Sequence, residues 1–155
     1  MTNLAEKSIF ISNLSNFISE NDKDLLQALE VFIKDYKQNK KISQIPVRLF
    51  SGKLAALEVI VKYLKEAGMN YAQIGKALNR DQRTIWVTYS KAQKKQKEQF
   101  TVKNDDLFVD IKTFSSKKPP LKSLILYLTD RGFSSKQIAS MLNRSYKNIW
   151  MIKNE

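Results

Sequence analysis

Residues 71–86 read YAQIGKALNRDQRTIW, and residues 135–150 read SKQIASMLNRSYKNIW. The similarity extends upstream, because residues 47–86 align with residues 111–150 at a constant offset of 64 without a gap, and 14 of the 40 aligned pairs are identical. Self-similarity at a fixed offset is typical of a duplicated structural unit. The sequence therefore predicts one small fold that occurs twice in the chain.

The first helix of each repeat is predicted by the spacing of its apolar residues. In the first repeat, apolar residues recur at intervals of three and four, which places them on one face of a helix. The residues of this stripe are Leu54, Leu57, Ile60, Val61 and Leu64. Gly68 follows, and glycine is the commonest residue just beyond a helix C-terminus. The pattern predicts a helix that buries one face and ends before Gly68.

Two shorter helices joined by a tight turn are predicted next. Segment 71–78 is short and polar, but two of its apolar residues lie four positions apart and can pack against the first helix. Asn79 follows this segment, and Asn143 has the same place in the second repeat. Asparagine tolerates the left-handed conformation that such a turn needs. Asp81 and Ser145 are then positioned to cap a third helix.

The stretch 71–86 resembles the helix-turn-helix of bacterial sigma factor region 4 and of response-regulator output domains, and residues 135–150 resemble it too. In those families a small residue lets the two helices approach, a Gly or Asn makes the turn four residues later, and an aliphatic residue six positions further on anchors the recognition helix. These places are held by Gly75, Asn79 and Ile85 in the first repeat and by Ala139, Asn143 and Ile149 in the second. The resemblance implies a DNA-binding module in each repeat.

The predicted fold is all-α, with an N-terminal helical hairpin followed by two duplicated trihelical helix-turn-helix modules. The hairpin is expected at residues 1–44, the first module at 45–98 and the second module at 111–155. Residues 99–110 are expected to form a connector, which either is flexible or holds the modules at a fixed spacing.

The N-terminal region has two apolar stripes with helical spacing, at residues 4–18 and 25–36, separated by a polar segment at 19–22. Two helices of this size cannot bury their apolar faces as an isolated hairpin. Residues 1–44 are therefore expected either to form a homodimer or to dock on the modules of the same chain.

Net charge is distributed unevenly along the chain. Residues 1–44 contain six Lys and six acidic residues, whereas residues 45–155 contain 21 basic and 9 acidic residues and so carry the whole net charge of +12. The neutral first segment argues against a Lys-rich bias of the whole proteome. A basic excess confined to one part of a chain predicts a polyanionic partner for that part.

Composition also excludes several classes of function. The chain has no Cys and no His, which removes thiolate and imidazole metal sites, disulfides and the usual Cys-His or Ser-His catalysis. No carboxylate pair or phosphate-binding loop stands out, so neither an enzyme, a cofactor nor a metal is predicted. The apolar stretch at residues 9–18 is interrupted by Ser and Asn, so neither a signal peptide nor a membrane partner is expected. The predicted location is the cytoplasm, in association with the nucleoid.

The resemblance implies which side chains face the major groove of DNA, because the N-terminal residues of a recognition helix lie nearest the base edges. These residues are Gln82, Arg83, Trp86 and Val87 in the first repeat and Tyr146, Lys147 and Trp150 in the second. Arg83 is suited to guanine and Gln82 to adenine. The alternative for Arg83 and Lys147 is a purely solvated side chain.

Other candidate contacts have two open interpretations each. Arg80 and Arg144 are expected either to bind phosphate at the helix N-terminus or to pair with nearby acidic residues. Trp86 and Trp150 directly follow a core Ile, so they are expected either to pack in the protein or to contact DNA. Lys91 is suited to a phosphate contact, although a solvated position is the commoner outcome for a surface Lys.

These observations predict a sequence-specific double-stranded DNA-binding protein, with transcriptional regulation as the first choice of role. A replication, partition or mobile-element DNA-binding protein would use the same parts. A helix-turn-helix adaptor for protein partners is a different class, and it would be favoured by acidic or apolar residues in place of Arg83 and Lys147. No RNA-binding motif is recognisable.

Overall fold

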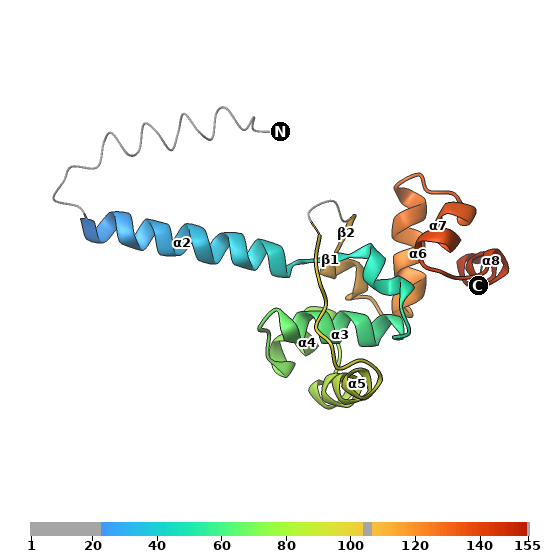
Figure 1. Ribbon diagram of the computed structural model, residues 1–155, viewed down its shortest axis with the longest axis horizontal. Helices are drawn as coiled ribbons and strands as arrows, with labels where there is room; N and C mark the ends of the chain where they lie inside the picture. The colour runs from blue at the N-terminus through green and yellow to red at the C-terminus, as the bar shows by residue number, and fades with distance from the viewer. Residues whose placement is uncertain (1–22, 104–106, 155) are drawn as a thin grey trace. The chain divides into compact units, whose positions relative to one another are not determined.

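The computed structural model describes residues 23–103 and 107–154. Helices dominate these residues, and one two-stranded sheet accompanies them (Figure 1). The α-helices are α2 (Lys23–Ile42), α3 (Ala56–Glu66), α4 (Tyr71–Leu78), α5 (Gln82–Lys95), α6 (Pro120–Asp130), α7 (Ser135–Met141) and α8 (Tyr146–Asn154). The remaining elements are β1 (Gln44–Pro46), β2 (Phe108–Asp110) and two 3₁₀ turns, η1 (Val47–Ser51) and η2 (Ile111–Phe114). The all-α prediction is confirmed in the coarse sense that helices dominate, whereas the sheet is not part of it.

The chain divides into two compact units, residues 1–41 and residues 42–155. In the first unit the structure describes α2, while the first helix of the predicted hairpin falls at residues 1–22, outside the described residues. Large apolar side chains are exposed along α2, namely Leu25, Leu26, Val31, Phe32 and Ile33. Within the described residues, no helix has the length and apolar character needed to cross a membrane.

In the second unit, each repeat forms three helices, α3–α5 and α6–α8 (Figure 1). Helix α5 packs on α3 and α4, and α8 packs on α6 and α7. The first helix of each repeat is followed by a glycine with positive φ, 99° at Gly68 and 89° at Gly132, as the sequence pattern predicts. Leu64 and Leu128, which occupy the same place in the two repeats, are fully buried.

The sheet joins the two repeats through equivalent residues. Strands β1 and β2 are antiparallel, and Ile45 lies opposite Val109. These two residues differ by 64 positions, which is the offset of the repeat. Phe50 and Phe114 are also equivalent, and their rings stack on each other with centroids 5.9 Å apart. A residue that contacts its own equivalent must lie near a two-fold axis.

Reciprocal contacts support the same symmetry. The backbone N–H of Val47 donates to the carbonyl of Leu107 (2.7 Å), and the backbone N–H of Ile111 donates to the carbonyl of Ser43 (2.9 Å). Each bond becomes the other when the offset of 64 is applied. Similarly, α4 packs on η2 and α7 packs on η1, and α3 packs on α6. The repeats thus share one core around a local two-fold axis.

This packing refines the predicted domain boundaries. Residues 99–110 were expected to be a connector between two modules, but their last three residues form β2 and pair with β1. Between the alternatives of a flexible connector and one that holds the repeats together, the paired strand favours the second. The reason is that backbone hydrogen bonds to a buried neighbour constrain the chain more than a solvated loop would.

Candidate nucleic-acid interface

The turn between α4 and α5 is built from local hydrogen bonds. Helix α4 is followed by Asn79, whose φ of 51° and ψ of 49° are left-handed. The backbone N–H of Arg80 then donates to the carbonyl of Gly75 (2.8 Å). The carboxylate of Asp81 accepts from the backbone N–H groups of Arg83 (2.8 Å) and Thr84 (3.3 Å), which caps α5. The predicted turn and cap are therefore confirmed in the first repeat.

The second repeat repeats this construction. Asn143 has a φ of 51°, identical to that of Asn79. The hydroxyl oxygen of Ser145 accepts from the backbone N–H of Asn148 (3.2 Å) at the start of α8. The backbone N–H of Arg144 donates to the carbonyl of Ala139 (2.9 Å). Equivalent left-handed Asn turns thus precede α5 and α8.

Small residues permit the close approach of the two short helices. A Cβ atom placed on Gly75 would lie 2.7 Å from the carbonyl oxygen of Arg80, which is closer than real Cβ contacts. Ala139 stands at the equivalent position of the second repeat and is nearly buried. Ile85 and Ile149, the expected anchors of α5 and α8, have no exposed surface. The residues that the resemblance assigned to packing therefore do pack.

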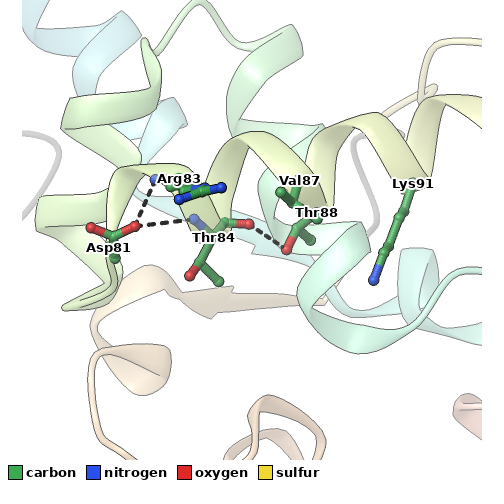
Figure 2. Close-up of a pocket in the computed structure, with 6 residues that line it drawn as sticks. All are labelled: Asp81, Arg83, Thr84, Val87, Thr88 and Lys91. Carbon is green, nitrogen blue, oxygen red and sulfur yellow. Dashed lines mark hydrogen bonds between the residues drawn. The ribbon is translucent and has the colours of Figure 1, made fainter.

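The opposite side of α5 is open to solvent. A shallow concave strip of about 330 Å³ runs along it, lined by Asp81, Arg83, Thr84, Val87, Thr88 and Lys91. Figure 2 shows these side chains following α5 from its capping residue to Lys91. The hydroxyl of Thr88 donates to the carbonyl of Thr84 (2.8 Å), so this side chain is satisfied by its own helix. Thr84 and Thr88 belong to this surface although the sequence did not single them out.

The two tryptophans are surface residues. Trp86 is 54% exposed and Trp150 is 53% exposed, so neither ring is buried in the core. Their neighbours on the same helices, Val87 and Tyr146, are 37% and 50% exposed. The equivalent aromatic rings of both repeats are therefore accessible from solvent.

Arg80 and Arg144 occupy the same position just before α5 and α8. The Nε atom of each is buried and has no hydrogen-bond partner. The ion pairs between described side chains join Lys62 to Glu66 and Lys95 to Glu58, so neither arginine pairs with an acidic residue there. Pairing with nearby acids, one of the two interpretations from sequence, is not seen among these residues.

Helix α5 is attached to α3 at its far end. The ammonium of Lys95 pairs with the carboxylate of Glu58 at 2.7 Å. The same carboxylate accepts from the backbone N–H of Ala55 (2.8 Å) at the start of α3. Ala92, which lies one turn before Lys95 on α5, is fully buried. The second repeat has no counterpart of this pair in the described residues, because Lys122 holds the position equivalent to Glu58.

Cationic, amide, hydroxyl and aromatic groups, together with Val87 and Met151, make up the exposed surface of α5 and α8. Neither helix contains an acidic residue. Gln82, Arg83, Lys91 and Lys147 are all exposed. No group of three or more acidic residues that could hold a metal occurs within residues 23–103 and 107–154. Such a surface can donate hydrogen bonds to an anion and to base edges.

No protein-family model, curated protein or solved structure matches the chain.

Proposed function

We propose that this chain is a sequence-specific double-stranded DNA-binding protein in which α4–α5 and α7–α8 act as two helix-turn-helix units. The observation that carries the proposal is the pair of exposed helices α5 and α8, neither of which contains an acidic residue. Each helix follows a left-handed Asn turn and a side-chain cap. This construction exposes the first turn of the helix, which is the part of a recognition helix that reaches base edges.

Specific contacts are assigned to the first turn of each helix. Arg83 can donate two hydrogen bonds to guanine, and Gln82 can pair with adenine in the major groove. Tyr146 and Lys147 occupy the equivalent places in α8. Thr84 adds an exposed hydroxyl group and methyl group to the surface of α5. The number of these side chains is enough for each helix to specify a few base pairs.

Backbone contacts are assigned to residues that flank the first turn. Arg80 and Arg144 lie immediately before the helix N-termini, where a phosphate is also favoured by the helix dipole. Their lack of an acidic partner among the described residues supports this role. Lys91 lies two turns further along α5 and is exposed. Phosphate contacts of this kind position the protein without reading sequence.

A protein-interaction adaptor is the alternative class. Exposed Trp86 and Trp150 would suit an apolar partner. Against it, both helices carry only basic charges, and residues 45–155 hold the entire net charge of +12. A polyanion therefore fits this surface better than a typical protein surface does. Transcriptional regulation is the proposed role, and replication, partition or mobile-element functions would use the same contacts.

Residues 1–44 are proposed to join two chains. Leu25, Phe32 and Ile33 on α2 are exposed, and exposed apolar side chains on one helix are costly in water. The segment has equal numbers of Lys and acidic residues, so two copies would not repel each other strongly. A second copy of this segment is the partner that these properties favour.

The decisive test is selection of duplexes from a random library with the full-length chain, followed by affinity measurement on the enriched sequence and on a scrambled duplex. Enrichment of a defined motif with at least tenfold preference over the scrambled duplex is expected. Failure to bind any duplex at low salt would overturn the proposal. Binding to single-stranded RNA in preference to the duplex would overturn it as well.

A further inference from the structure

We infer that one chain reads two inverted and unequal half-sites, so that its DNA target is an imperfect palindrome bound by α5 and α8 of the same molecule. This inference rests on the proposed DNA-binding function and adds the arrangement and content of the target. A tandem repeat in sequence suggests a tandem repeat in DNA, but the packing of the repeats gives the opposite arrangement.

The first argument is the register of the sheet. Gln44 lies opposite Asp110, and Pro46 lies opposite Phe108. Applying the repeat offset of 64 to Gln44 gives Phe108, and applying it to Pro46 gives Asp110. The offset therefore exchanges the two pairs. A rotation of 180° exchanges equivalent residues in this way. A translation would carry the first repeat onto the second without exchanging them, so it would not produce this pairing.

The second argument is that this axis governs the helices as well as the strands. Phe50 stacks on Phe114 at 5.9 Å, and α3 packs on α6. Helix α5 is fixed on α3 by buried Ile85 and Ala92, and α8 is fixed on its own repeat by buried Ile149. Because each outer helix is bound to an element that obeys the axis, α5 and α8 are related by it too.

The third argument concerns DNA geometry. A two-fold rotation preserves the component of any direction along its axis, so the exposed faces of α5 and α8 share whatever tilt they have toward one end of the axis. The same rotation reverses their direction across the axis. B-DNA has two-fold axes perpendicular to its length, and two-fold proteins bind palindromic sites for this reason. Two helices related in this way read the two strands in opposite directions.

The two half-sites differ because the reading residues differ. Equivalent first-turn positions hold Gln82 and Tyr146, Arg83 and Lys147, and Thr84 and Asn148, and the second turns hold Val87 and Met151. Trp86 and Trp150 are identical, as are Arg80 and Arg144. Asn148 is exposed and supplies an amide, which suits adenine, at a place where α5 has Thr84. The α5 half-site is thus expected to contain a guanine contacted by Arg83, and the α8 half-site an adenine contacted by Asn148.

The test begins with the motif selected by the full-length chain, from which four duplexes are made. They carry the two half-sites inverted, the two half-sites in direct orientation, the α5 half-site alone, and a scrambled sequence. Spacing is kept constant. The inverted duplex is expected to bind most tightly. Native mass spectrometry is expected to find one duplex for every chain, so that a dimer joined through residues 1–44 would carry two duplexes. The direct duplex should bind no better than the single half-site.

Two variants then assign the half-sites. Arg83→Ala should remove base preference in the α5 half-site only, and Asn148→Ala should remove it in the α8 half-site only. In each variant, the preference for the correct base in the affected half-site is expected to fall about 5- to 150-fold, which is the range of a good bidentate base contact. Circular dichroism of both variants checks that they are folded, and both residues are exposed.

Three results separate this inference from the function on which it rests. Tighter binding to the direct duplex, with sequence preference retained, overturns the inverted arrangement and leaves DNA recognition intact. If every two chains bind a single duplex, and Arg83→Ala relaxes base preference in both half-sites together, the palindrome is read by two copies of α5 and the inference is wrong. Absence of binding to all four duplexes at low salt overturns the proposed function itself.

Discussion

Ile45 and Val109 lie opposite each other in the antiparallel strands β1 and β2, and neither side chain has any exposed surface. They occupy the same position in the two repeats, 64 residues apart. The most buried point of the sheet is therefore a contact between a residue and its own equivalent. This single relationship makes residues 42–155 an internal dimer built from one chain.

Truncation of this contact should destabilise the whole second unit. Ile45→Ala removes buried methyl groups beside Val109 and is expected to cost about 2–5 kcal/mol of unfolding free energy. Gln44→Ala, at the exposed first residue of the same strand, should stay within about 0.5 kcal/mol of the original chain. Denaturant unfolding followed by circular dichroism measures both values. Equal losses would show that the sheet does not hold the repeats together.

The turn before α5 should depend on glycine. Gly75→Ala places a Cβ atom 2.7 Å from the carbonyl oxygen of Arg80, and the backbone must shift to relieve this contact. The expected cost is about 1–3 kcal/mol. The reverse change in the second repeat, Ala139→Gly, meets no such contact and should cost about 0.5–1 kcal/mol through backbone entropy. A stabilised Gly75→Ala chain in thermal unfolding would contradict the close-packed turn.

DNA affinity should fall steeply with salt. Each phosphate neutralised by Lys or Arg releases condensed counterions, so the log–log slope of affinity against salt should be about −0.9 for every contact. Several contacts are expected from the basic residues beside α5 and α8. Fluorescence anisotropy between low and moderate salt measures the slope. A flat dependence would mean that the basic residues of 45–155 do not contact DNA phosphates.

Arg83 should contribute to sequence-specific DNA affinity, whereas Lys94 should contribute to affinity for any duplex. Arg83→Ala is expected to cost about 1–3 kcal/mol on the selected sequence and less on scrambled DNA, because it removes a base contact. Lys94→Ala removes the same unit of charge near the C-terminal end of α5, so it should weaken both duplexes equally and lower the salt slope. If the two variants behave alike on both duplexes, Arg83 contacts phosphate only.

Self-association should depend on the apolar side of α2. Phe32 is 67% exposed, and Phe32→Glu is expected to lower the association constant at least tenfold because it places a charge in the proposed contact. Gln27→Glu adds the same charge at another exposed position of α2 and serves as the control. Sedimentation equilibrium of the full-length chain gives the constants. A chain that is monomeric before any substitution would remove the homodimer from the proposal.

Local structure was predictable from the sequence because it depends on neighbouring residues. Left-handed Asn79 and Asn143 and the caps at Asp81 and Ser145 follow from the preferences of those side chains. The anchors, the positive-φ glycines and the duplication itself could be recognised in the same way. The candidate site was predicted for the same reason, since most of its residues lie on one short helix in each repeat. Thr84, Thr88 and Asn148 were missed because nothing about an isolated polar residue distinguishes a site from ordinary surface.

What the sequence determined by itself is the duplicated unit, its helices and turns, and the confinement of the charge of +12 to residues 45–155. Only the tertiary structure decided how the two units face each other. Three-residue strands at 44–46 and 108–110 have no periodicity to detect, and their pairing joins segments that are far apart in the chain. The exposure of Trp86 and Trp150 was also undecided, because it depends on how each helix is rotated against its neighbours. Local preferences act over a few residues, whereas the two-fold axis arises from burying the equivalent apolar surfaces of both repeats against each other.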